Sequence, residues 1–212
     1  IAEIGVNHNG SLDIAYELID AAVRAQADIV KFQSFKAHQL VTPSAPLAKY
    51  QKAEAKQSDS QLNLLSELEL SDKQHIELKR YCDECGIEFL STPFSIERLN
   101  FLLCEGLIKR IKVPSGEITN LPLIVKAGAT RLPVILSTGM ANQDEIKEAL
   151  AMLNFGRSNG VVPLLSKDLA SHVAEKSFFG INDVTVLQCV TQYPATIDTA
   201  NLRLLREFET FF

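Results

Sequence analysis

Two lysines and two glutamates lie in or directly beside short apolar segments of the sequence, where a charged side chain is costly to bury. Successive side chains of a strand point to opposite faces, so Lys31 and Gln33 share one face of their segment. Lys112 has apolar neighbours on both sides, and Glu3 and Glu117 are the carboxylates that could pair with the two ammonium groups. This set predicts a site for a small, doubly anionic ligand. The alternative is a pair of internal ion pairs with a purely structural role.

Hydroxyl side chains follow three of the apolar segments and strengthen the prediction of an anion site. They occur in Ser91-Thr92, Ser115-Gly116 and Ser137-Thr138-Gly139. Hydroxyls and the accessible backbone N–H groups beside glycine are typical components of phosphate and oxyanion sites. Ser and Thr also cap helices at strand–helix turns, so each motif alone is a weak indication.

The elements that would position these residues alternate between short apolar strands and amphipathic helices, several of which are followed by glycine. Ser11 is predicted to cap the first helix, and capping boxes are predicted at Ser71/Gln74 and Asn142/Glu145. The chain's longest irregular stretch runs from about 34 to 69 and contains one short helix at about 62–68, and a looser segment runs from about Gly156 to Asp183. Strands are expected at about 1–6, 28–33, 87–90, 110–113, 133–136 and 184–187.

About six strand–helix units predict an α/β fold, namely a (β/α)8 TIM-type barrel truncated before its last two units. An open doubly wound sheet has the same rhythm, but no strand here is followed by a G-x-G-x-x-G turn. The polar residues at the carboxyl ends of the strands favour the barrel, whose active sites are built there. We therefore expect residues 1–212 to be a single catalytic barrel domain, incomplete at its C-terminus.

Composition narrows the class of protein further. The chain has 212 residues, 46% of them hydrophobic, and a formal charge of −5 with its 21 Lys and Arg dispersed, which argues against nucleic-acid binding. No apolar run approaches the ~18 residues of a membrane span. We expect a cytoplasmic protein whose two ends lie outside this sequence.

Histidine and cysteine give no convincing metal site. His38, His75 and His172 are expected at the surface, whereas His8 either contacts a substrate or stabilises its turn. The four cysteines are expected to be buried thiols, and the C-x-x-C pair formed by Cys82 and Cys85 lies on an apolar helical stripe, which favours packing over zinc or redox chemistry.

Six ordered motifs resemble one enzyme family, the N-acetylneuraminate (sialic acid) synthases with their legionaminate and pseudaminate relatives. The resemblance runs from the first residue to about Asn201. The motifs that carry it are Ile1-Ala-Glu-Ile-Gly-Val-Asn-His-Asn-Gly10, Val30-Lys-Phe-Gln33, Leu90-Ser-Thr-Pro-Phe-Ser95, Ile111-Lys-Val-Pro-Ser-Gly-Glu117, Leu136-Ser-Thr-Gly-Met140 and Gln188-Cys-Val-Thr-Gln-Tyr-Pro194.

The resemblance implies a phosphoenolpyruvate-dependent transferase that forms a C–C bond. Phosphoenolpyruvate and an open-chain N-acylated hexosamine meet at a divalent metal, which is usually Mn²⁺, with Mg²⁺ or Co²⁺ as alternatives. C3 of phosphoenolpyruvate attacks the sugar aldehyde, water adds at C2, and C–O cleavage releases phosphate to give a nonulosonic acid. The acceptor would be N-acetylmannosamine or a diacetamido-trideoxyhexose.

Matching by motif position assigns roles to nine residues. Glu3, Lys112 and Glu117 form the catalytic set, with Glu3 as the acid/base or water-orienting carboxylate. Gln33, Glu117 and Tyr193 would contact the sugar. The phosphate and carboxylate of phosphoenolpyruvate would be held by Lys31, Thr92, Lys112, Ser115 and Ser137.

The resemblance also implies parts that this sequence lacks. The family's metal-binding histidines belong to the seventh and eighth strands, so the metal ligands and a small antifreeze-like domain are expected beyond Phe212. The chain is thus expected to be inactive alone and to form a homodimer when full length. Two other readings remain, a Schiff-base barrel aldolase that uses Lys31 or Lys112 and a non-catalytic sugar-binding barrel.

Overall fold

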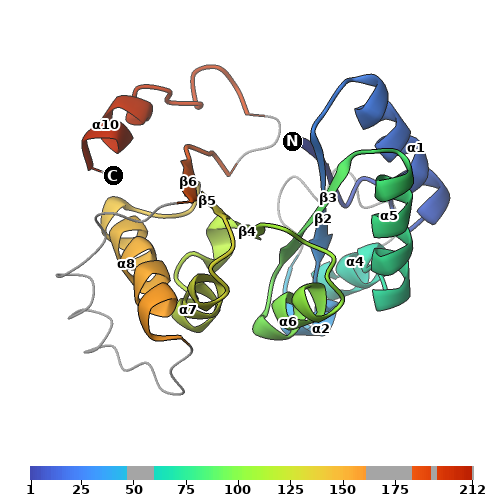
Figure 1. Ribbon diagram of the computed structural model, residues 1–212, viewed down its shortest axis with the longest axis horizontal. Helices are drawn as coiled ribbons and strands as arrows, with labels where there is room; N and C mark the ends of the chain where they lie inside the picture. The colour runs from blue at the N-terminus through green and yellow to red at the C-terminus, as the bar shows by residue number, and fades with distance from the viewer. Residues whose placement is uncertain (47–59, 161–182, 192–194, 212) are drawn as a thin grey trace. The chain divides into compact units, whose positions relative to one another are not determined.

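The computed structural model describes residues 1–46, 60–160, 183–191 and 195–211, which form two compact units, Ile1–Ile108 and Lys109–Phe212 (Figure 1). Each unit contains a three-stranded parallel sheet with its strands in sequential order. No helix among these residues is long and apolar enough to cross a bilayer. The strands of the first sheet are β1 (Ala2–Gly5), β2 (Ile29–Ser34) and β3 (Glu88–Pro93), and those of the second are β4 (Ile111–Val113), β5 (Val134–Ser137) and β6 (Val184–Leu187).

The predicted strand–helix rhythm is confirmed, and parallel pairing fixes which side chains share a face. In the first sheet Lys31 lies opposite Glu3 and Leu90, and Gln33 lies opposite Thr92. Partners in register point to the same face of a sheet, so the polar residues of β1, β2 and β3 gather on one face at their carboxyl ends.

Two of the first unit's helices begin where the sequence predicted caps. The Ser11 side chain accepts a hydrogen bond from Ile14 N at the start of α1 (Leu12–Arg24). Ser71 and Gln74 form the predicted capping box of α5 (Asp72–Glu84). The short helix expected at 62–68 is α4 (Gln61–Leu68), and α2 (Ala37–Leu40) and α6 (Ile96–Cys104) complete the described helices of this unit.

In the second unit α7 (Leu121–Ala129) and α8 (Gln143–Asn159) pack closely together, as Figure 1 shows. A Cβ at Gly128 would overlap the carbonyl oxygen of Leu153, and a Cβ at Gly156 would overlap that of Val125. The two helix backbones therefore touch at these glycines. The short helix η1 (Ser115–Glu117) and the last helix α10 (Leu204–Phe211) belong to the same unit.

The expectation that a looser segment starts near Gly156 is wrong. The helix α8, opened by the predicted Asn142/Glu145 capping box, continues through Gly156 to Asn159 and ends at Gly160, whose φ is +74°. A glycine is required at position 156 of the helix because α7 packs too closely for a side chain. Gly160 ends the helix with a positive φ, which glycine adopts without strain. The rest of the expected looser segment, from 161 to 182, lies outside the described residues.

Candidate functional site

In the first unit, Glu3, Lys31, Gln33 and Thr92 lie on the polar face at the carboxyl ends of β1, β2 and β3. The Lys31 ammonium forms an ion pair with Glu3, and the Lys31 side chain is only 12% exposed while that of Glu3 is 45% exposed. A Cβ at Gly5 would lie 3.0 Å from Glu3 Oε1 and 3.7 Å from Gln33 Nε2. The predicted pairing of Lys31 with a glutamate is thus confirmed, and the amide of Gln33 lies close to the same carboxylate.

The two hydroxyl residues of β3, Ser91 and Thr92, lie on opposite faces of the sheet. Thr92 lies opposite Gln33, whereas Ser91 lies opposite Phe32 on the other face of the sheet. Both hydroxyl oxygens are buried and neither has a hydrogen-bond partner among the described residues. A buried hydroxyl without a partner is unfavourable, so Thr92 Oγ1 on the polar face has hydrogen-bonding capacity that the described residues do not use.

In the second unit, Lys112 is buried on β4 with 7% of its surface exposed. Its ammonium donates hydrogen bonds to Ser137 Oγ at 2.6 Å and to the carbonyl oxygen of Val113 at 2.8 Å. Lys112 lies opposite Ile135, two residues before Ser137, so the lysine and the serine share a face by strand register. The predicted grouping of Lys112 with a strand-end hydroxyl is confirmed.

Ser115 and Glu117 lie in η1, directly after β4. Both are partly exposed, and Glu117 Oε2 accepts a hydrogen bond from Asn120 Nδ2 at 2.7 Å. Asn120 also caps α7 by accepting from Leu123 N, so it fixes the carboxylate next to the start of that helix. Tyr193 lies outside the described residues.

A hollow of about 210 Å³ lies beside Ser137, at the carboxyl ends of β5 and β6. Thr138 and Gly139 line it from the turn after β5, Gln188 and Cys189 from the segment after β6, and Phe208 from α10. Thr138 Oγ1 donates to the carbonyl oxygen of Leu187 at 2.9 Å, which ties the two strand ends together.

Cys189 is a residue of this region that sequence reasoning did not single out. Its Sγ lies 3.5 Å from Ser137 Oγ, the same oxygen that Lys112 contacts. The signal was available, since Cys189 follows the sixth strand within one of the quoted motifs. The general expectation of buried thiols holds for Cys82 but is wrong for Cys104, which is exposed, and for Cys85 and Cys189, which are half-buried.

Two histidines are fully enclosed by protein. His8 is 1% exposed, its Nδ1 accepts a hydrogen bond from Gly10 N at 3.0 Å, and burial lowers its pKa despite a contact with the Gly5 backbone. These contacts favour the turn-stabilising role over substrate contact. His38 is exposed as expected, and His172 lies outside the described residues.

The expectation that His75 lies at the surface is wrong. Its Nδ1 lies 3.0 Å from the carbonyl oxygen of Ser71, which can only accept, so the proton of the neutral ring is on Nδ1. Burial lowers the pKa of His75 to about 4, partly opposed by the Ser71 carbonyl. His75 faces the core because it precedes the buried Leu78 and Cys82 of α5 by three and seven residues.

Across residues 1–46, 60–160, 183–191 and 195–211 no group of three or more His, Cys, Asp or Glu side chains is arranged to hold a metal ion. The described residues therefore do not fit a divalent metal by themselves.

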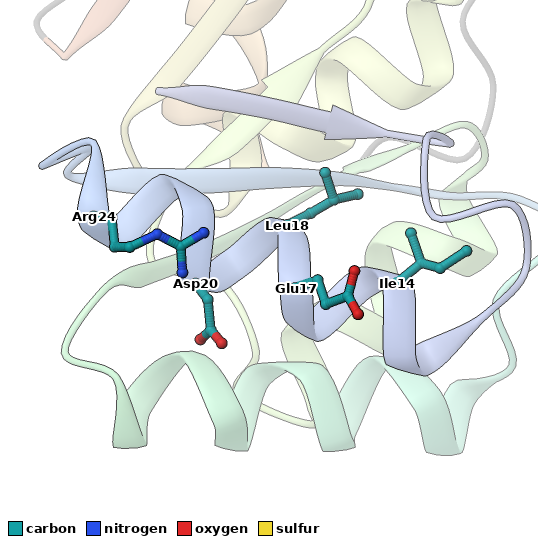
Figure 2. A pocket seen from close by; sticks show the side chains of 5 residues that line it. All are labelled: Ile14, Glu17, Leu18, Asp20 and Arg24. Carbon is teal, nitrogen blue, oxygen red and sulfur yellow. The ribbon is translucent and has the colours of Figure 1, made fainter.

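Another hollow, of about 360 Å³, is lined by side chains of α1 (Figure 2). All the described residues that line it belong to this one helix, and they include Glu17, Asp20 and Arg24. Asp20 already accepts a hydrogen bond from the Tyr81 hydroxyl at 2.9 Å. A groove formed by one helix brings together no groups from different strands, so it is a poor candidate for the site of chemistry.

Parallel strands with helices between them define an α/β protein, and in proteins of this class ligands bind at the carboxyl ends of the strands. Comparison with known proteins then identifies the family. The NeuB family matches residues 18–212, and the chain belongs to that family.

Individual relatives agree with this assignment. The chain is 42% identical over 212 residues to the N,N'-diacetyllegionaminic acid synthase of Campylobacter jejuni, covering 100% of this chain and 57% of that protein. It is 39% identical over 206 residues to the enzyme of the same name from Legionella pneumophila, covering 97% of this chain and 52% of that protein. The chain therefore spans about half the length of the curated relatives it matches.

A solved structure extends the similarity to three dimensions. The N-acetylneuraminic acid synthetase of Leptospira borgpetersenii, crystallised with citrate, superposes with a TM-score of 0.77 at 26% identity, covering 100% of this chain and 60% of that one. The α/β fold with parallel sheets is thus shared with a sialic acid synthase.

Proposed function

We propose that this chain is the N-terminal part of a nonulosonate synthase, which condenses phosphoenolpyruvate with an N-acylated hexosamine and releases phosphate. In this proposal the six strands are six of the eight of a (β/α)8 barrel, and residues 1–212 are one incomplete catalytic domain. The names of the two legionaminic acid synthases support a diacetamido-trideoxyhexose as the acceptor, with N-acetylmannosamine as the alternative.

The observation that carries the proposal is the placement of two largely buried lysines on strands with polar carboxyl ends. Lys31 of β2 forms an ion pair with Glu3 of β1, and Lys112 of β4 donates a hydrogen bond to Ser137 Oγ. Phosphoenolpyruvate carries a phosphate and a carboxylate, and such a ligand would offset the cost of burying two ammonium groups. We assign Lys31, Thr92, Lys112, Ser115 and Ser137 to these two anionic groups.

The remaining residues are assigned to the acceptor and to the movement of protons. Gln33, Glu117 and Tyr193 contact the sugar, and Glu3 orients the attacking water or exchanges a proton with the reacting groups. The bond between C3 of phosphoenolpyruvate and the aldehyde carbon forms, and the aldehyde oxygen takes up a proton. Water oxygen then bonds to C2 and loses one proton; the remaining hydroxyl loses the second proton as the C2 carbonyl forms and the bond between C2 and the phosphate oxygen breaks. The aldehyde oxygen and the released phosphate take up one proton each. These steps consume one water and yield a nonulosonic acid and phosphate.

A divalent metal, with Mn²⁺ as the first candidate, is part of the proposal for the full-length protein. It supplies Lewis-acid polarisation of a carbonyl when bound. The described residues do not fit it, and the family resemblance places its ligands on the seventh and eighth strands, beyond Phe212. We also propose that the full-length protein is cytoplasmic and forms a homodimer. Sedimentation of the full-length protein would test the dimer.

The test is an assay of the full-length protein with phosphoenolpyruvate, Mn²⁺ and a panel of N-acylated hexosamines, scored for phosphate release. Release that depends on one acceptor supports the proposal, and no release with any sugar rejects it. Lys112→Met is expected to abolish turnover while the protein stays folded. Borohydride trapping with pyruvate separates the Schiff-base alternative, because condensation with phosphoenolpyruvate leaves no lysine adduct.

A further inference from the structure

The side chain of Asn120 joins Glu117 to the start of α7. Its Oδ1 accepts a hydrogen bond from Leu123 N at 3.3 Å, which caps the helix, and its Nδ2 donates to Glu117 Oε2 at 2.7 Å. A cap usually binds the N–H of the second or third helical residue, and the second residue here is Pro122, which has none. The amide oxygen therefore faces Leu123 N, and the NH2 group is turned away from the helix, toward the carboxylate.

Asn142, which caps α8, is an asparagine without this second contact. Its Oδ1 accepts from Asp144 N and from Glu145 N, each at 3.0 Å, and no described residue accepts a hydrogen bond from its Nδ2. Aspartate and serine cap helices about as well as asparagine does, but neither side chain has an NH2 group. Capping alone would thus be satisfied by either residue at position 120, and the donor to Glu117 is what asparagine adds there.

The backbone between Glu117 and α7 is held by other contacts. Glu117 N donates to the carbonyl oxygen of Pro114 at 3.0 Å, and Asn120 N donates to that of Glu117 at 3.0 Å. Ile118, which is only 2% exposed, anchors the turn in the core. The hydrogen bond from Asn120 Nδ2 therefore sets the direction of the Glu117 carboxylate and not the path of the chain. Without this bond the half-buried glutamate side chain would sample several rotamers.

This carboxylate belongs to the edge of the second sheet at which Lys112 and Ser137 lie. The short helix η1 directly follows β4, the strand of Lys112. A Cβ at Gly116 would lie 3.9 Å from Met140 Sδ, so η1 also lies beside the turn that follows β5, the strand that ends at Ser137. Asn120 binds Oε2 of the carboxylate, and no described residue donates to Oε1. Oε1 therefore keeps acceptor capacity that the described residues do not use.

We propose that Asn120 is a positioning residue for the acceptor sugar: it fixes one oxygen of the Glu117 carboxylate, so that the other, Oε1, accepts a hydrogen bond from a hydroxyl or amide N–H group of the sugar. This inference rests on the proposed synthase function, in which Glu117 contacts the acceptor. That proposal assigns the two anionic groups of phosphoenolpyruvate to other residues. A change at Asn120 should therefore act on the acceptor and spare phosphoenolpyruvate.

The experiment measures KM for the acceptor and for phosphoenolpyruvate separately, in the full-length protein with Mn²⁺. Asn120→Ser keeps a cap but removes the donor, whereas Asn120→Asp keeps a cap and sets a second carboxylate against Glu117. We expect the acceptor KM to rise about threefold in Asn120→Ser and about tenfold in Asn120→Asp, with the phosphoenolpyruvate KM within about twofold of wild type. Asn142→Ser and Asn142→Asp are the matched controls and should change neither KM, because both keep the cap of α8.

The outcomes distinguish the two proposals. Wild-type protein that releases no phosphate with any acceptor overturns the synthase function and this inference with it. With an active wild type, the positioning role alone is overturned if the Asn120 variants keep the wild-type acceptor KM or raise both KM values equally. Equal effects of serine and aspartate at position 120 also overturn it, since capping alone treats the two residues alike. Urea unfolding of each variant completes the test, because an acceptor KM that rises only where the unfolding midpoint falls is explained by a lost cap.

Discussion

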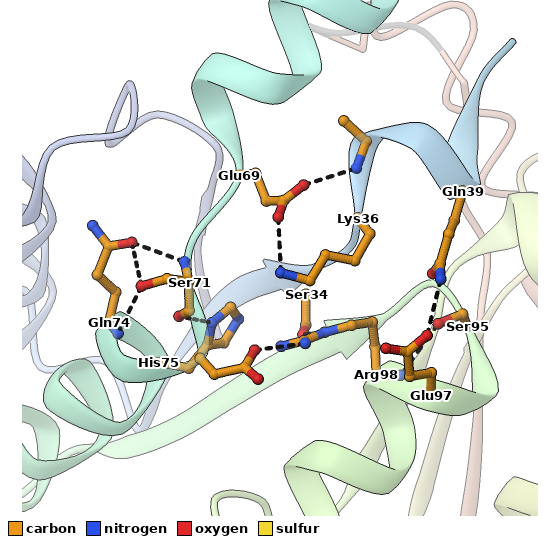
Figure 3. Close-up of polar contacts among 12 residues, drawn as sticks. Ser34, Lys36, Gln39, Glu69, Ser71, Gln74, His75, Ser95, Glu97 and Arg98 are labelled. Atoms are coloured by element: carbon orange, nitrogen blue, oxygen red, sulfur yellow. Dashed lines mark hydrogen bonds and ion pairs between the residues drawn. The ribbon is translucent and has the colours of Figure 1, made fainter.

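Each of the two compact units has a lysine on a parallel strand, but the helices of the two units are held in place by different contacts. In Ile1–Ile108 buried polar contacts tie helices to the sheet, as where Arg98 of α6 contacts Ser34 of β2 and Asp72 of α5 (Figure 3). In Lys109–Phe212 the helices α7 and α8 touch through backbone at two glycines. Polar contacts respond to pH and to the loss of one partner, whereas backbone contact responds only to added volume. The first unit should therefore be sensitive to charge and the second to size.

The largest effect is expected from filling the contact between α7 and α8. Gly156→Ala gains about 1 kcal/mol of helix propensity but forces the helices apart, and overpacking of this kind costs about 3 kcal/mol. We expect a net loss in the free energy of unfolding, measured by urea titration of the full-length protein. Ser158→Ala, an exposed position on the same helix, is the control and should change it little. Equal stability of both variants would show that the helices can separate freely.

The next largest effect is expected from removing the buried guanidinium of the first unit. Arg98 is 2% exposed and lies over the ring of Phe101, with 4.4 Å between guanidinium carbon and ring centroid. Arg98→Leu removes the donor to Ser34 Oγ, whereas the Asp72 carboxylate is half-exposed and stays solvated by water. We therefore expect the free energy of unfolding to fall by about 2 kcal/mol.

The matched control is the exposed pair on α5, Arg80 and Glu84, whose side chains are largely in solvent. Arg80→Leu should change the free energy of unfolding by less than about 0.5 kcal/mol. If the two arginine variants lose similar amounts of unfolding free energy, burial is not the reason that Arg98 stabilises the protein.

Near neutral pH the smallest effect, specific to the first unit, is the pH dependence of His75, which grows as the pH falls. Burial lowers its pKa in the folded protein to about 4 from the ordinary 6.5. Between these values the unfolded chain binds a proton that the folded protein does not, so stability is full above about pH 6.5 and falls as the pH drops toward 4. The slope from this group approaches 1.4 kcal/mol per pH unit. The measurement is urea unfolding at several pH values for wild type and His75→Gln, whose curve should lack this step, and parallel curves would contradict the assignment.

Local patterns predicted much of the framework. Ser11, Ser71 with Gln74, and Asn142 with Glu145 begin their helices as predicted, because a cap depends only on residues within one turn. The pairing of Lys31 with Glu3 also followed from reasoning about burial.

The failures involve contacts between distant parts of the chain. The cap that Glu69 gives to α2 joins residues 32 positions apart, and Arg98 lies 64 positions from Ser34. The sequence predicted a looser segment from about Gly156, because nothing near this glycine in the sequence indicates the backbone of α7 that packs against it. His75 was the avoidable error, since it shares the helical spacing of Leu78 and Cys82.

The central claim is that Lys31 and Lys112 both bind phosphoenolpyruvate, and calorimetric titration of this ligand into the full-length protein tests it most directly. Lys31→Met and Lys112→Met should each weaken binding by about 100-fold, because each removes a charge-assisted contact from a largely buried site. Lys147→Met, on the partly exposed face of α8, should bind as wild type does. If either strand-lysine variant binds phosphoenolpyruvate with wild-type affinity while remaining folded, the account of the anion site is wrong.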